Sequence, residues 1–245
     1  MEQTVLVLGG TGRTGGRVLQ QMLDRGFQVR AIVRSTRRLP AGVVAAPWLT
    51  VVEAEPLALS HEALQRHLRG CSAVVSCLGH NISLKGIFGP PRDLVTQATQ
   101  RLCRAIQALR PALPIRLIVM SSVSVNQPQW LDTARSPLDR ALLALIRGLL
   151  PPAQDNQRAA EFLCRAIGPD DPFVQWVALR PDTLVDGEVT RYTLHEGIVN
   201  SLFKPARTNM ANVAHFMGEL VANPAVWQAW RGRLPVIVNG GAGSA

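Results

Sequence analysis

The stretch Val5-Leu-Val-Leu-Gly-Gly-Thr-Gly-Arg-Thr-Gly-Gly16 decides the fold of this 245-residue chain. Its apolar run, Val5–Leu8, predicts a buried strand, and the residues from about Thr14 to Arg25 predict a helix. The glycines between them permit a tight turn, because a Cβ atom would block either a positive φ or the approach of a phosphate. Backbone N–H groups at the helix start can then face a pyrophosphate. The stretch therefore predicts a strand-turn-helix unit that binds nucleotide phosphates.

The glycines can be read in two registers. Gly9, Gly12 and Gly15 form GxxGxxG, whereas Gly10, Gly12 and Gly15 form GxGxxG. We favour the first register, because Gly9 directly follows the last residue of the strand. The predicted cofactor contacts in this turn are Gly9, Gly10, Thr11, Gly12, Arg13, Thr14 and Gly15.

Basic residues follow the second predicted strand, Gln28–Val33, at the point where a protein that prefers NAD usually carries an acidic residue. Arg34 takes that position, and Arg37 and Arg38 come shortly after it. Guanidinium groups bind phosphate in bidentate geometry, so the pattern predicts NADP(H), with Arg34 and Arg38 as contacts. For Arg37 or Arg38 taken singly, a solvated basic turn is an equal alternative.

Short apolar strands alternate with helices along the chain. Further strands are predicted at 48–54, 73–77, 115–120 and 174–179, and helices at 61–68, 94–109 and 153–167. This alternation predicts an α/β fold with a doubly wound, Rossmann-type parallel sheet and helices on both faces. We expect one domain over 1–245, with a substrate-side elaboration at 183–238 and a mobile tail at 239–245. The elaboration is expected to hold a helix near 209–221 and a last strand at 235–238.

Ligands of such sheets bind beyond the carboxyl ends of the strands. The remaining predicted cofactor contacts lie at those ends: Glu55, Cys77, Leu78, Gly79, Met120, Ser121 and Pro181. Glu55 is expected near the adenine ring. A loop at 80–92 is expected to overhang the site, and 138–150 to form a helix packed on the domain in preference to a lid. His80 follows Gly79 at this crevice, although an exposed loop histidine is the favoured interpretation.

Composition disfavours several classes of function. The formal net charge is +9, yet the 26 lysines and arginines are scattered and aromatic residues are few, which disfavours nucleic acid as a partner. No apolar run reaches 18 residues, so no membrane association is expected. The four cysteines and five histidines lack metal-ligand spacing, so no metal is predicted and a reducing, cytoplasmic location is favoured. The expected partner is a small-molecule substrate, which the sequence does not identify.

Together these residues resemble the short-chain dehydrogenase/reductase superfamily, in its atypical branch of NmrA-like, isoflavone-reductase-like and flavin/biliverdin-reductase-type proteins. The resemblance covers nearly the whole chain and is carried by the glycine turn, Arg34, Val74–Gly79, Leu117–Ser122, Ala160-Glu161, Leu179–Pro181 and Asn212–Ala214. It implies an NAD(P)-binding oxidoreductase in which Ser121 or Ser122 is a catalytic residue that orients the nicotinamide carboxamide or the substrate. For both serines, an equal alternative is that the hydroxyl only forms hydrogen bonds with backbone groups at the strand end.

The Tyr-x-x-x-Lys pair that performs acid/base chemistry in typical members is missing. Tyr192 is the single tyrosine, and it lies downstream of the sixth predicted strand with Glu196 four residues later. Gln157 occupies the lysine position, and the neighbouring Arg158 is expected to bind ribose or phosphate. Hydride transfer to a flavin, a quinone or a similar acceptor stays feasible, because substrate or solvent can supply the proton. The alternative is a non-catalytic, NmrA-like dinucleotide sensor with a regulatory protein partner; an extended-branch epimerase or dehydratase is a third, weaker hypothesis.

Overall fold

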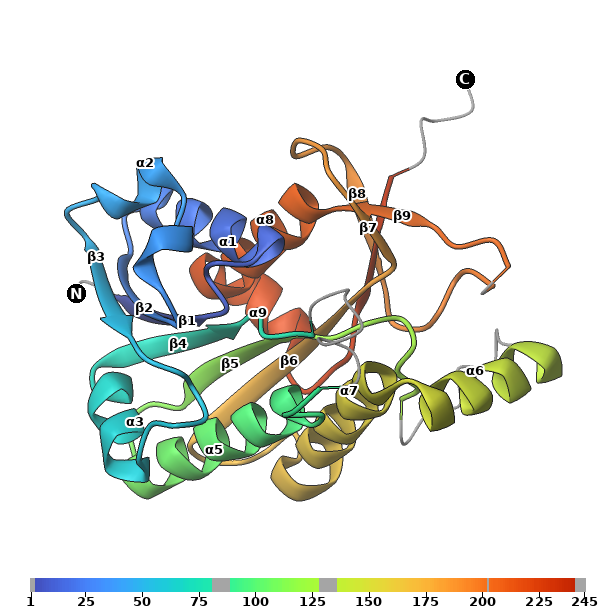
Figure 1. Cartoon of the computed structure of the whole chain (residues 1–245), viewed down its shortest axis with the longest axis horizontal. Helices are drawn as coiled ribbons and strands as arrows, with labels where there is room; N and C mark the ends of the chain where they lie inside the picture. Colours follow the sequence, from blue (N-terminus) through green and yellow to red (C-terminus); the bar gives the residue numbers. More distant parts are fainter. Residues whose placement is uncertain (1–2, 81–88, 128–135, 202, 241–245) are drawn as a thin grey trace.

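The computed structural model describes residues 3–80, 89–127, 136–201 and 203–240 (Figure 1). Within these ranges the chain forms an eight-stranded sheet in the order β3-β2-β1-β4-β5-β6-β10-β8. Neighbouring strands are parallel, except that β8 is antiparallel to β10. The strands are β1 (Thr4–Leu8), β2 (Gln28–Val33), β3 (Leu49–Glu53), β4 (Cys71–Ser76), β5 (Ile115–Met120), β6 (Val174–Pro181), β8 (Tyr192–His195) and β10 (Val236–Asn239). A separate parallel pair consists of β7 (Thr183–Val185) and β9 (Arg207–Asn209).

Helices cover both faces of the sheet (Figure 1). One face carries α1 (Arg13–Asp24), the short α2 (Ala41–Val44), α8 (Met210–Ala222) and α9 (Pro224–Trp230). The other face carries α3 (His61–Leu68), α5 (Leu94–Leu109) and α7 (Pro151–Phe162). Helix α6 (Pro137–Leu149) packs against α7. The predicted doubly wound, Rossmann-type fold is confirmed, and the strand order reverses between β1 and β4, where such folds bind ligands.

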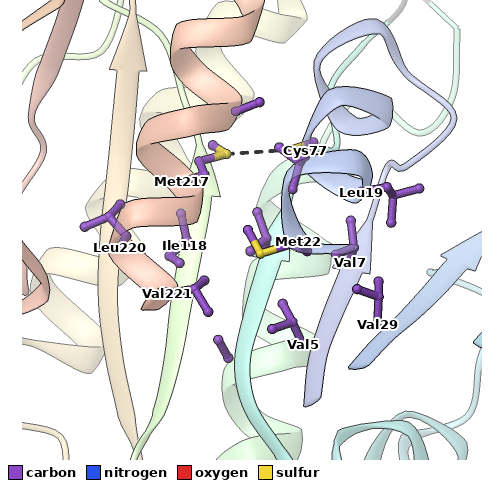
Figure 2. Packing of buried hydrophobic residues seen from close by; sticks show 14 of the residues in the cluster. Val5, Val7, Leu19, Met22, Val29, Cys77, Ile118, Met217, Leu220 and Val221 are labelled. Carbon is purple, nitrogen blue, oxygen red and sulfur yellow. Dashed lines mark hydrogen bonds between the residues drawn. The ribbon is translucent and has the colours of Figure 1, made fainter. Parts of the chain in front are cut away.

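The first strand divides its side chains between two cores. Val5 and Val7 pack with α1 and α8, whereas the leucine on either side of Val7 packs against the helices of the opposite face. Figure 2 shows the first core, in which Met22 of α1 and Met217 of α8 lie over the sheet. Burial on both faces explains the continuous apolar run of β1 and holds the end of this strand, from which the glycine turn starts.

Several predicted boundaries coincide with the observed ones: β2, α3, α5 and β5 begin and end at the predicted residues. The helix predicted over 153–167 begins two residues earlier, at Pro151, and its last turn is of another helix type. Its α-helical part ends at Phe162, and Leu163–Ile167 form a π-helical turn. Gly168 causes this ending, because its φ is +72° and its N–H donates to the Leu163 carbonyl at 2.9 Å.

The C-terminal residues extend the main sheet, with β10 inserted between β6 and β8. The predicted mobile tail at 239–245 begins too early. Asn239 ends β10, and its side chain bonds to those of Asn209 and Asn212 at 2.8 Å each. The Gly240 N–H donates to the Arg191 carbonyl at 2.7 Å, and residues 241–245 lie outside the described ranges. The assignment of one domain with an elaboration at 183–238 stays a prediction.

Arg180, the next-to-last residue of β6, is fully buried. Its guanidinium donates to the carbonyls of Leu234 at 2.8 Å, Val125 at 3.0 Å and Glu196 at 3.1 Å. The segments after β5, after β8 and before β10 are therefore joined at one buried cation, beside the carboxyl ends of the strands.

Candidate functional site

A cavity opens at the carboxyl ends of β1, β2 and β4. Its lining combines the glycine turn, the basic turn after β2 and the residues after β3 and β4: Gly9, Thr11, Gly12, Ile32, Val33, Arg34, Arg38, Glu55, Pro56, Cys77, Leu78, Gly79, Pro91 and Leu94. These segments are far apart in sequence and meet here because parallel strands end at the same edge of the sheet.

Gly9 makes the tight turn, as the GxxGxxG register predicts. Its φ is +76°, and a Cβ atom there would lie 2.6 Å from the Cys77 carbonyl oxygen. The Gly12 N–H donates to the Gly9 carbonyl at 2.9 Å, which closes the turn. Gly12 is also the N-cap of α1 and has no side chain to cap the first-turn N–H groups. The helix start is therefore left open to an anion.

Three predicted contacts of the turn face the protein and not the cavity. A Cβ atom on Gly15 would collide with the Gly9 carbonyl, and one on Gly10 would lie 2.6 Å from a methyl group of Leu19. Thr14 is buried at the start of α1. Gly10 and Gly15 thus permit close packing of helix and turn, and do not line the cavity.

Arg34 and Arg38 line the cavity, whereas Arg37 does not. Both lining guanidinium groups are exposed, and neither has a hydrogen-bond partner in the described part of the chain. The turn that carries them is ordered by Glu53, whose carboxylate accepts the Thr36 N–H at 3.1 Å. This hydrogen bond lowers the pKa of Glu53 and keeps it charged at neutral pH. The basic pair is therefore presented to the cavity on an ordered turn.

Arg13 lies outside the cavity lining. Its guanidinium forms an ion pair with Asp186, which also pairs with Arg17 at 3.2 Å. Asp186 follows β7, so a carboxylate from the C-terminal part of the chain engages the start of α1. The sequence pattern placed Arg13 near a phosphate because it could not show this long-range partner.

The end of β4 contributes Cys77, Leu78 and Gly79 to the lining, as predicted. Burial raises the pKa of the Cys77 thiol to about 12. The group stays protonated at neutral pH, so it supplies neither a nucleophile nor a metal ligand there. No cluster of three His, Cys, Asp or Glu side chains able to hold a metal occurs among the described residues.

The other predicted residues of the strand ends lie farther along the sheet, after β5 and at the end of β6, and do not line the cavity. The Ser121 hydroxyl is buried and has no hydrogen-bond partner in the described ranges. In contrast, the Ser122 hydroxyl accepts the Ser124 N–H at 3.2 Å, which satisfies a local turn. Met120 packs against the core, and Pro181 is buried with its carbonyl bonded to the Val123 N–H at 3.2 Å. Only Ser121 therefore keeps a polar group available for a ligand.

Gln157, at the lysine position, has a structural contact. Its amide accepts the Asn126 N–H at 2.8 Å and donates to the Asn126 carbonyl at 3.2 Å, which ties the segment after β5 to α7. Arg158 lines a different surface hollow, with Arg92 and Gln154. The Tyr192 hydroxyl lies 2.9 Å from His215 Nδ1 and does not line the cavity. Burial raises the pKa of this hydroxyl. None of these side chains replaces the missing tyrosine at the cavity.

A buried carboxylate beside the site had no signal in the sequence. Asp155 accepts the N–H groups of Val95 at 2.8 Å and Thr96 at 2.9 Å, at the start of α5. It also contacts His80 Nε2 at 2.8 Å. The expectation of an exposed loop histidine is wrong, because this pairing buries the His80 side chain. Asp155 therefore fixes the chain just after Gly79 against α5 and α7.

This arrangement fits a dinucleotide. A glycine-rich turn and an uncapped helix start follow one edge of the sheet. Among the described residues, two guanidinium groups without a partner and a buried hydroxyl without a partner follow the same edge. A family model described as NAD(P)H-binding matches residues 9–224. The chain belongs to this NAD(P)H-binding family. The expected membership of an NAD(P)H-binding family is confirmed.

A known protein is similar to this chain in sequence, and solved structures are similar to it in fold. A chloroplastic protein of Arabidopsis thaliana, described as uncharacterized, is 26% identical over 212 residues, which are 82% of this chain and 72% of that protein. A short-chain dehydrogenase/reductase of Veillonella parvula in complex with NADP has a TM-score of 0.69 at 14% identity, over 98% of this chain and 96% of that one. An anaerobilin reductase of Escherichia coli O157:H7 has a TM-score of 0.67 at 16% identity, over 99% of this chain and 100% of that one.

Proposed function

We propose that this NAD(P)H-binding protein is an NADP(H)-dependent oxidoreductase that transfers hydride to a small acceptor such as a flavin or a quinone. The observation that carries the proposal is the pair Arg34 and Arg38, both unpartnered in the described ranges, in a cavity that starts at the glycine turn. A 2′-phosphate adds two negative charges beside the adenosine ribose, and paired guanidinium groups bind such a phosphate strongly.

The residues of the cavity have separate tasks in this proposal. The turn at Gly9 and Gly12 and the open start of α1 would hold the pyrophosphate through backbone N–H groups. Arg34 and Arg38 would hold the 2′-phosphate, and Glu55 lies where the adenine is expected. Bound NADPH supplies the hydride, so the protein needs only to bind, orient and exclude water around the acceptor.

Proton supply separates this protein from typical relatives of the superfamily. Within the described ranges, the Ser121 hydroxyl is the one unpartnered group at the end of β5, and we propose that it orients the acceptor or the carboxamide. A hydroxyl with its ordinary chemistry is a poor acid near neutral pH. Acceptors that take their proton from solvent, such as flavins and quinones, therefore suit this site better than simple ketones.

Replacing Arg34 by alanine is expected to weaken NADPH binding by roughly tenfold or more, because one charge-assisted hydrogen bond is worth about 1.5–3 kcal/mol. NADH binding should hardly change, since NADH has no 2′-phosphate. Titration of both cofactors, followed by tryptophan fluorescence or calorimetry, measures the two affinities. Arg37→Ala is the matched control, because Arg37 lies on the same turn but does not line the cavity. Equal affinities for NADPH and NADH in the unaltered protein would refute the NADP(H) preference.

A non-catalytic dinucleotide sensor is the second candidate. The observation in its favour is Gln157, which takes the lysine position. Its side-chain amide is hydrogen-bonded to the backbone of Asn126. NADPH oxidation should be followed at saturating cofactor with flavins, quinones and dicarbonyl compounds as acceptors. Sustained turnover with any acceptor excludes the sensor, whereas tight NADPH binding without turnover excludes the oxidoreductase for these acceptor classes.

A cytoplasmic location is part of the proposal, together with a small-molecule substrate. It is supported by the four cysteines, all of which are free thiols. No helix in the described ranges has the length and apolar character to cross a bilayer.

A further inference from the structure

The outward face of α6 is apolar and exposed. The side chains of Leu138, Leu145 and Leu149 are 65%, 57% and 62% exposed. Their spacings of seven and four residues place them on one side of the helix, and Ala141 and Gly148 extend the same side. A surface helix normally turns its charged residues outward. Here the leucines face solvent instead, so this side of α6 has the composition of a contact surface.

A second exposed segment lies beside the start of α6. Ser201 donates its hydroxyl hydrogen to Asp139 of α6 at 3.1 Å. Near Ser201 in the chain, Val199 and Phe203 are 45% and 63% exposed, and Lys204 is exposed as well. We call Leu138, Leu145, Leu149, Val199 and Phe203 the α6 face. Figure 1 shows α6 projecting from the body beyond α7, on the side to which the strands point.

A second copy of the chain fits this surface poorly. A helix of 13 residues is about 20 Å long, so its outward strip falls well short of the roughly 800 Å² per partner that a stable dimer buries. Charge also opposes self-association. Arg140 is the exposed charge that the structure describes on α6, and each copy carries a net charge of +9. Association of two copies would bring these like net charges together.

An anionic bilayer surface fits the α6 face better. Peripheral helices that lie in the headgroup region combine leucine or phenylalanine with lysine or arginine, as Leu138, Leu145 and Phe203 combine with Arg140 and Lys204 here. The only acidic residue of α6, Asp139, is buried by its capping bonds to Ser136. The α6 face thus offers apolar area, with positive charge beside it at Lys204 and on the opposite side of the helix at Arg140, and without an exposed carboxylate on α6.

We propose that the α6 face docks this protein on an anionic membrane surface. The leucines of α6 and Phe203 enter the boundary between headgroups and acyl chains, and Lys204, next to Phe203, faces the anionic headgroups. Arg140 lies on the opposite side of α6 and adds attraction to the anionic surface over a longer distance. This docking departs from the expectation of no membrane association, which rested on the lack of an apolar run of 18 residues. Such a run is needed to span a bilayer, whereas peripheral docking needs only one exposed apolar side. The docking does not depend on the cofactor preference, so either proposal can fail without the other.

Co-sedimentation of the full chain with vesicles tests this inference. Vesicles of phosphatidylcholine with about one-third phosphatidylglycerol should bind the protein, and pure phosphatidylcholine should bind it markedly less. The double variant Leu145→Gln/Leu149→Gln is expected to bind anionic vesicles roughly tenfold or more weakly. Raising NaCl from about 0.1 M to about 1 M should also weaken binding, because it shortens the screening length to about 3 Å.

Leu113→Gln is the matched control, because Leu113 is 79% exposed and lies at the opposite end of the sheet, before β5. It should bind vesicles like the unaltered protein. NADPH titration and circular dichroism of the same samples check that every variant is folded. The inference is overturned if the unaltered protein does not bind, if neutral and anionic vesicles bind equally, or if the double variant keeps full binding. A lipid-free dimer that the double variant abolishes would assign the face to a second copy and overturn it too.

Discussion

Gly15→Ala is expected to weaken NADPH binding by roughly tenfold to a hundredfold, an effect of about 1–3 kcal/mol. The added methyl group would collide with the Gly9 carbonyl and lie 2.8 Å from the Gly9 carbonyl carbon and 3.1 Å from the Gly10 Cα. All three atoms belong to the backbone of the turn, so relief requires moving the turn itself. The N–H groups aimed at the pyrophosphate then move with it. Calorimetric titration with NADPH measures the loss.

Gly42→Ala is the control for this substitution. A Cβ atom on Gly42 would meet nothing within 4 Å, and Gly42 lies in α2 with an ordinary helical φ. This variant should bind NADPH normally and be slightly more stable, since alanine restricts the unfolded chain. Unchanged NADPH affinity in Gly15→Ala, with circular dichroism showing a folded protein, would disprove the role of close packing in shaping the turn.

Arg180→Met is expected to lower the free energy of unfolding by about 3 kcal/mol or more. Methionine keeps much of the side-chain volume but leaves the carbonyls of Leu234, Val125 and Glu196 without their donors. Each buried acceptor left unsatisfied costs about 1–3 kcal/mol, partly offset because no charge is buried in the variant. Urea unfolding followed by circular dichroism, extrapolated to water, measures the difference.

Arg233→Met provides the comparison for Arg180. Arg233 pairs with Glu196, but both side chains are more than half exposed, at 53% and 73%. Solvent screens such a pair, so its loss should change the free energy of unfolding by about 1 kcal/mol or less. Similar destabilisation by the two variants would show that the buried bonds of Arg180 contribute no more than a surface pair.

Local patterns predicted the strand-turn-helix unit with its glycine at positive φ. Strand β1 is recognisable because burial on both faces requires an apolar run, and Gly9 because the turn comes directly after it. Likewise α5 and β5 begin and end where periodicity and breaker residues place them. The helix predicted over 153–167 ends where the helical residues end, but apolar periodicity did not show that its last turn, Leu163–Ile167, is π-helical.

Contacts between distant residues could not be predicted in the same way. Arg13 and Arg34 are both arginines beside a phosphate motif, yet Asp186 pairs with Arg13 and leaves Arg34 to the cavity. Asp155 is one polar residue on a predicted helix, and only folding brings it to the start of α5 and to His80. The burial of such groups depends on long-range packing, which leaves no periodic trace in the sequence.

Residues near one another in the chain thus sufficed for the fold class, the phosphate-binding turn and the basic residue after β2, because strand burial, turn geometry and strand order act over short distances. Tertiary structure decided which glycines face the cavity and which pack beneath it, which arginines line the cavity, and where β10 enters the sheet. Many such outcomes depend on residues far apart in the sequence, as with Arg13 and Asp186, which are 173 residues apart. Their positions are set by the packing of the two cores on either side of β1.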